Sequence, residues 1–65
     1  EPLRLDMLVD GKVIVEAKSV LVDNPVFKAQ ALSYLRLARL HLGFVINFNV
    51  TMIKDGIERV INFKA

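Results

Sequence analysis

The sequence predicts a small α/β (α+β-like) domain in which a β-hairpin is followed by one helix and two further strands. Three observations lead to this fold class. Two apolar runs flank Asp10-Gly11-Lys12, a helix-start signal follows at Asn24-Pro25, and the later segments Phe44–Phe48 and Ile57–Phe63 have the composition of strands. The predicted order of elements is therefore ββαββ.

Length and composition limit how stable such a chain can be as a monomer. It has 65 residues, of which 54% are apolar, and it contains no cysteine. A domain of about 60 residues buries only about 60% of its unfolded surface, and here neither a disulfide nor a thiolate metal site adds stability. We therefore expect a homo-oligomer, or a missing N-terminal segment, to cover the apolar surface.

Charge and hydropathy indicate where the chain acts. The net charge of +2 is compatible with a nucleic-acid partner but does not require one. No apolar run approaches the roughly 20 residues of a membrane span, and no segment of the sequence has the charged-then-apolar pattern of a secretory leader. We expect no membrane partner and a cytoplasmic location.

The hairpin is expected to pair Leu3–Val9 with Val13–Lys18. Odd-numbered positions are apolar in both strands, whereas even-numbered positions are polar away from the turn. A register that keeps odd with odd gives one wholly apolar face and requires an odd-length loop, such as residues 9–11 with Gly11 in the left-handed conformation. The prediction is that the odd face is the buried one.

This register places Asp6, Glu16 and Lys18 together on the other face. Asp6 would lie opposite or diagonal to Glu16, roughly 5–8 Å away, where two carboxylates can share a hard divalent cation. The alternative is that these are solvated charges on the open face of a sheet, with ion pairs worth about 0–1 kcal/mol. The pattern alone favours the alternative.

The helix is expected to begin with Asn24 as cap and Pro25 at its first position, and to run to about Leu40. Gly43 ends it or begins the next strand. The continuous apolar run Phe44–Phe48 predicts a strand covered on both faces. A turn at "KDG" and a more exposed strand, Ile57–Phe63, complete the chain.

Asp6, Glu16-Ala17-Lys18 and Gln30-x-x-x-Tyr34 occur in that order on the hairpin and the helix. With the segments "RLDMLVDGKVIVEAKSV" and "AQALSYLRLARLHLGFVINFNV", the chain resembles the PD-(D/E)XK nuclease superfamily, and more narrowly its small GxxExxR family. The resemblance covers nearly the whole chain. It implies one nuclease-like domain over residues 1–65 with a mixed sheet, lacking the N-terminal helix that carries the Gly-x-x-Glu-x-x-Arg motif.

The resemblance also implies metal-dependent hydrolysis of nucleic-acid phosphodiester bonds. Asp6, Glu16 and the backbone carbonyl of Ala17 would hold Mg²⁺ or Mn²⁺, Lys18 would assist the attacking water, and Gln30 and Tyr34 would support the site. Oxygen ligands suit Mg²⁺, and an ammonium group can stabilise developing negative charge. The alternative is a catalytically inactive nuclease-fold protein that serves as an interaction or scaffold module.

Several helix residues have two interpretations. Gln30 and Tyr34, four apart, share one helix face and would face the site, or Tyr34 is a core aromatic and Gln30 a border residue. The stripe of Lys28, Arg36 and Arg39 is a solvated face, with phosphate contact as the second interpretation. We also expect His41 to be a helix-end residue and Asn47 and Asn49 to form strand-end turns.

Overall fold

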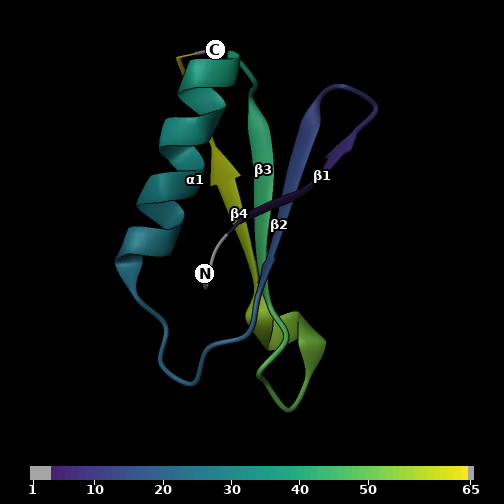
Figure 1. Ribbon diagram of the computed structural model, residues 1–65, viewed down its shortest axis with the longest axis vertical. Coiled ribbons are helices and arrows are strands. Elements are labelled where there is room, and N and C mark those ends of the chain that lie inside the picture. Colours follow the sequence, from purple (N-terminus) through teal and green to yellow (C-terminus); the bar gives the residue numbers. More distant parts are fainter. Residues whose placement is uncertain (1–3, 65) are drawn as a thin grey trace.

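One helix packs against one face of a four-stranded mixed sheet (Figure 1). The computed structural model describes residues 4–64, with residues 4–6 described through their backbone only. The elements are β1 (Arg4–Val9), β2 (Val13–Lys18), α1 (Pro25–Ala38), β3 (Leu42–Asn47), the 3-10 helix η1 (Ile53–Gly56) and β4 (Ile57–Ile61). The strand order is β1-β2-β3-β4, with β2 and β3 parallel and the outer pairs antiparallel. The predicted fold class and element order are confirmed.

The helix α1 begins as predicted and ends two residues earlier than expected. The side chain of Asn24 accepts a hydrogen bond from the backbone N–H of Val26, and Pro25 occupies the first turn. At the other end Arg39 adopts a left-handed conformation with φ 57°, so its N–H reaches the Arg36 carbonyl and the N–H of Leu40 reaches the Leu35 carbonyl. This is a Schellman motif formed without glycine. Within residues 4–64 no helix is long and apolar enough to cross a membrane.

The hairpin has the predicted odd-length loop, displaced by one residue. Asp10 and Gly11 both have positive φ, 55° and 65°, and the N–H of Lys12 donates to the Val9 carbonyl at 3.0 Å. Near the loop the pairing keeps odd with odd, as in Val9 with Val13. The register then shifts between Leu5 and Met7, which places a β-bulge at Asp6 and sets Leu5 opposite Glu16. The predicted register is therefore correct only in the half of the hairpin next to the loop.

The prediction that the odd face of the hairpin is buried is wrong. On β2 the buried side chains are Ile14, Glu16 and Lys18, while the odd positions are only half-buried. The reason is connectivity: α1 connects the parallel strands β2 and β3, and such crossovers are almost always right-handed. The handedness of this connection fixes the face that the helix covers, whatever residues that face carries.

The core lies between α1 and the covered face of β2, β3 and β4. It consists of Ile14, Phe27, Ala31, Leu35, Val45 and Val60. Gly43 allows the close approach of helix to sheet, because a Cβ there would lie 3.3 Å from the Ile14 carbonyl oxygen and 3.5 Å from the Leu35 methyl groups. The strand β3 is fully buried only on this face, so the expectation that it is covered on both faces is wrong.

The opposite face of the sheet, here called the open sheet face, is apolar and lacks a covering element among residues 4–64. Met7 and Ile57, on the two edge strands, are 54% and 48% exposed. The strand pairings and the alternation of side chains place the following residues on this face: Met7, Val9, Val13, Val15, Ala17, Leu42, Phe44, Ile46, Ile57, Arg59 and Ile61.

Candidate active site

Glu16 and Lys18 lie two residues apart on β2, so both side chains share the covered face. They are 3% and 6% exposed. Glutamate and lysine are almost never fully buried unless they are paired, because removing a charge from water is costly. The alternative interpretation of these two residues as solvated surface charges is therefore wrong.

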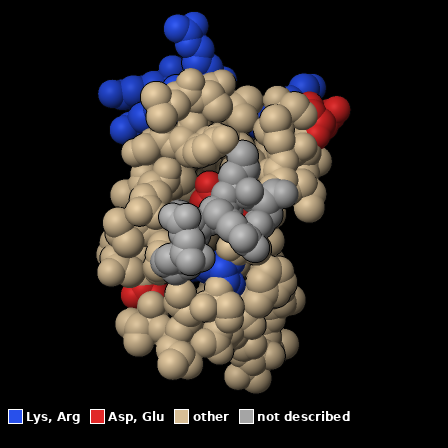
Figure 2. Space-filling model, viewed as in Figure 1, with Lys and Arg blue, Asp and Glu red and all other residues tan. Residues whose placement is uncertain are grey.

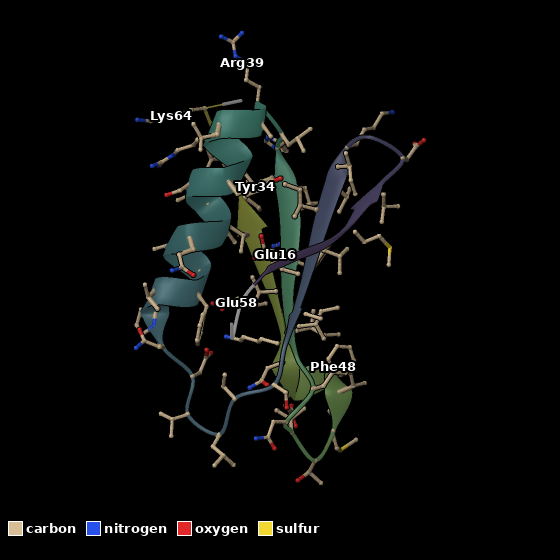
Figure 3. All side chains as sticks on the ribbon, in the orientation of Figure 1. Glu16, Tyr34, Arg39, Phe48, Glu58 and Lys64 are labelled. Atoms are coloured by element: carbon tan, nitrogen blue, oxygen red, sulfur yellow. The ribbon has the colours of Figure 1, made fainter. Side chains whose placement is uncertain are left out.

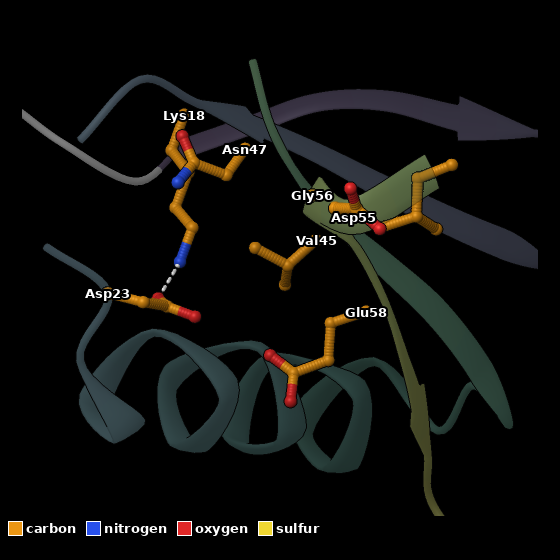
Figure 4. Close-up of a pocket in the computed structure, with 8 residues that line it drawn as sticks. Lys18, Asp23, Val45, Asn47, Asp55, Gly56 and Glu58 are labelled. Atoms are coloured by element: carbon orange, nitrogen blue, oxygen red, sulfur yellow. Dashed lines mark hydrogen bonds and ion pairs between the residues drawn. The ribbon is translucent and has the colours of Figure 1, made fainter. Parts of the chain in front are cut away.

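The ammonium group of Lys18 has two neighbours, Asp23 in the loop before α1 and Phe27 in the first turn of α1; Figure 4 shows the contact with Asp23. Its Nζ lies 2.5 Å from Oδ1 of Asp23 and 4.0 Å from the centre of the Phe27 ring. The hydrogen bond from Lys18, together with one from the backbone N–H of Asn24, lowers the pKa of Asp23 below its usual value. The ion pair and the aromatic face fix the position of the Lys18 charge.

Asn47 ties the loop that carries Asp23 to the end of β3. Its Oδ1 accepts from the N–H groups of Val20 and Asn49, each at 3.1 Å, and its Nδ2 donates to the Val20 carbonyl at 3.1 Å. The predicted strand-end role of Asn47 is confirmed. Gly56 lies directly against the backbone of Asn47. Only glycine fits there, because a Cβ would lie 2.0 Å from the Asn47 carbonyl oxygen.

A hollow of about 270 Å³ opens beside the Lys18–Asp23 pair. Val45 and Asn47 line it from β3, Asp55 from η1 and Glu58 from β4 (Figure 4). The register places Glu16 and Glu58 on either side of Val45 in one row across the sheet, and Figure 3 shows both near the middle of the sheet. Glu58 also approaches Lys28 of α1, with 3.7 Å between Nζ and Oε2. One end of the covered face thus combines buried charge with access to solvent.

The family model of the PD-(D/E)XK nuclease superfamily matches residues 1–60. The chain belongs to the PD-(D/E)XK nuclease superfamily. Comparisons with curated proteins and with solved structures gave no match. The four-stranded mixed sheet with one helix is consistent with the fold of this superfamily, so the predicted superfamily is confirmed.

PD-(D/E)XK nucleases typically use divalent metal ions. Among the described residues no group of three or more His, Asp or Glu side chains is close enough together to hold a metal ion. Glu16 contributes a buried carboxylate, which is the hard oxygen donor that Mg²⁺ and Mn²⁺ prefer. The backbone of Asp6 lies at the bulge on the neighbouring strand, and its side chain lies outside the described residues.

The remaining predicted site residues are Ala17 on β2 and Gln30 and Tyr34 on α1. The side chain of Ala17 is on the open sheet face, and the role of its backbone carbonyl stays a prediction. Gln30 is exposed on α1 and Tyr34 is 42% exposed, so Tyr34 is not a core aromatic. The buried positions of α1 are Phe27, Ala31 and Leu35. A supporting role for Gln30 and Tyr34 also stays a prediction.

Sequence reasoning missed Asp23 and Glu58. Glu58 precedes the buried Val60 by two residues, and this alternation could have placed it on the covered face of β4. Asp23 carried no periodic signal, because its contact with Lys18 depends on the path of the loop between β2 and α1. Both carboxylates line the hollow beside Lys18.

Proposed function

We propose that this chain is a metal-dependent nuclease domain that hydrolyses phosphodiester bonds of nucleic acids. The observation that carries the proposal is the burial of Glu16 and Lys18 on the helix-covered face. Burying two charges costs free energy of hydration that an apolar pair at these positions would not cost, so the charges are better explained by function than by stability. Superfamily membership supports the same reaction. The pattern Gln30-x-x-x-Tyr34 on α1 supports the narrower GxxExxR family.

In the proposed site, Asp6, Glu16 and the carbonyl of Ala17 would hold Mg²⁺ or Mn²⁺, since all three offer oxygen ligands. When bound, such an ion lowers the pKa of water and neutralises charge on a phosphate. The chain itself fixes the Lys18 ammonium group, which has three N–H donors. One of them goes to Asp23, and the group would act on the attacking water or on the negative charge that develops on the phosphate.

A hydrolysis assay on fluorescently labelled oligonucleotides with Mn²⁺ tests this function. We expect Lys18→Met and Glu16→Gln each to lower the rate by about 100-fold or more, because the first removes the group that acts on the water or the phosphate and the second removes a ligand of the metal ion. The matched controls are Lys12→Met and Asp10→Asn, since both residues are exposed in the hairpin loop. We expect the controls to stay within about threefold of wild type.

The proposed function would be contradicted by a folded wild-type chain that hydrolyses neither DNA nor RNA, or by full activity in Lys18→Met. Circular dichroism of each variant separates loss of chemistry from loss of fold. The expected spectra match that of wild type, because Lys18→Met keeps most of the buried stem and Glu16→Gln keeps the shape of the side chain.

The second candidate function is a catalytically inactive interaction module. The open sheet face favours it, because a broad apolar surface is typical of a contact with another protein surface. In that case the site substitutions would leave partner binding unchanged, whereas charges placed on the open sheet face would abolish it.

A further inference from the structure

A second hollow, distinct from the one beside Lys18, runs between α1 and the end of β4. It has a volume of about 490 Å³ and is lined by four cationic side chains, here called the basic groove: Lys28, Arg36, Arg59 and Lys64. The chain has nine Lys and Arg residues in all, so nearly half of them gather in this one place. No carboxylate lines the groove among the residues that the structure describes.

These cations come from two elements that are far apart in the sequence. Lys28 and Arg36 are eight residues apart on α1, which spaces them about 12 Å along the helix axis. Arg59 belongs to the edge strand β4, where alternation places it on the open sheet face, and it lines the groove from the edge of the sheet. Lys64 follows that strand. Figure 2 shows basic side chains gathered at the end of the molecule where α1 ends, and Figure 3 shows Arg39 and Lys64 at this end. The fold therefore assembles a positive surface that neither segment has alone.

The groove is not only charged. Leu32 and Ile61 line it, and Phe63 lines it while remaining 85% exposed. An exposed aromatic side chain beside a positive groove is the combination that binds single-stranded nucleic acid, because the cations contact phosphates and the ring stacks on a base. Asn62 fixes this segment, since its N–H donates to the His41 carbonyl at 2.8 Å and its Nδ2 to the Leu40 carbonyl at 3.0 Å.

The basic groove continues toward the proposed active site. Lys28 lines both the groove and a neighbouring depression that it shares with Asp23, Asn24 and Glu58. Asp23 and Glu58 in turn line the hollow beside Lys18. A strand that occupies the groove would therefore lead along the surface to the face that carries Lys18.

We propose that the basic groove binds single-stranded nucleic acid, with its cations on phosphates and Phe63 stacked on a base, and that it directs the strand to the Lys18 site. The second part rests on the proposed nuclease function. The first part stands on the convergence of four cations and an exposed aromatic ring in one hollow.

Fluorescence anisotropy tests the binding. The probe is a labelled single strand of about 15 nucleotides, and EDTA is present so that no hydrolysis occurs. The double variant Arg36→Glu/Arg59→Glu should bind about 30-fold more weakly than wild type, with a shallower dependence on salt. Lys12→Glu/Lys54→Glu changes the net charge equally at two exposed positions outside the groove, and should lose less than about threefold.

Phe63→Leu tests the stacking contact, with Phe48→Leu as its control. Phe48 is also exposed, at 58%, and Figure 3 places it at the opposite end of the sheet from Lys64. Phe63→Leu should weaken single-strand binding by about tenfold, whereas Phe48→Leu should leave it unchanged. A duplex probe should respond much less to Phe63→Leu, since its bases are already stacked.

The proposal is overturned if wild type does not bind the single strand, if the two double variants lose equal affinity, or if the two phenylalanine variants behave alike. Its failure and that of the nuclease function can be told apart. Hydrolysis by wild type with intact binding in Arg36→Glu/Arg59→Glu rejects the groove and keeps the nuclease. Groove-dependent binding without any Mn²⁺-dependent hydrolysis supports the groove and rejects the nuclease.

Discussion

The two faces of the sheet differ in a way that reverses the usual arrangement. The face under α1 buries Glu16 and Lys18, each less than a tenth exposed, and carries Asn47 and Glu58 in the neighbouring strands. The open sheet face has almost only apolar side chains, and Met7 and Ile57 at its edges are about half exposed. If hydrophobic burial alone decided the packing, α1 would cover the open sheet face, because that face carries more apolar side chains.

Two lessons follow from this difference. The face that α1 covers depends on the crossover between β2 and β3 and not on the count of apolar residues. The charges on that face also contribute little to stability, because a buried ion pair often adds less to the free energy of unfolding than an apolar pair of the same volume. We infer that the covered face is organised for chemistry and the open sheet face for contact with another surface.

The largest expected effect is on stability, and it should distinguish a buried leucine of α1 from an exposed one. Leu35 is fully buried under the covered face, whereas Leu37 is 87% exposed. Leu35→Ala should lower the free energy of unfolding by about 2–5 kcal/mol, because it leaves a cavity between α1 and β3. Leu37→Ala should change it by less than about 0.5 kcal/mol. Urea denaturation of both variants checks this, and equal losses would show that α1 does not pack as described.

The next effect concerns the open sheet face. We expect wild type to dimerise at micromolar concentration through this face, and Met7→Lys/Ile57→Lys to raise the dissociation constant by about 100-fold, because each new charge must be desolvated in the contact. Leu21→Lys/Leu37→Lys is the control, since both leucines are exposed away from the sheet. Sedimentation of the three proteins measures the change. A cooperatively folded wild-type monomer would rule out self-association.

The smallest effect concerns the Lys18–Asp23 pair. The folded-state pKa of Asp23 is lowered, so the ion pair contributes stability above the unfolded pKa, about pH 4, and this stability is lost as the pH falls through the lowered folded value. Wild type should be more stable than Asp23→Asn above about pH 4, and the two should converge in stronger acid. In a Lys18→Met background the difference should largely vanish at every pH, because the main cause of the shift is gone.

Local signals in the sequence were sufficient to predict the helix and the strands. The cap at Asn24 and the left-handed Gly11 were predictable from single residue types, and alternation placed Glu16 and Lys18 on one face. The bulge at Asp6 was not predictable, because nothing in the alternation of β1 distinguishes that residue from a regular strand position.

The surroundings of Lys18 were less predictable than its position. Asp23 reaches it through an irregular loop, and Glu58 enters the same hollow because β4 pairs with β3, a relation that only the sheet order provides. The basic groove was partly predictable from the sequence, since Lys28 and Arg36 share a helix face. Its other cations, Arg59 and Lys64, join them only once β4 is placed beside α1.

The central claim, that the covered face holds a divalent cation through Glu16, is tested most directly by the thermal stability of the chain with and without Mn²⁺. A cation that binds only the folded state stabilises it by mass action. We predict that about 1 mM Mn²⁺ raises the melting temperature of wild type by about 5 °C or more, and that Glu16→Gln removes this increase. The same increase in Glu16→Gln, or none in a well-folded wild type, would contradict the claim.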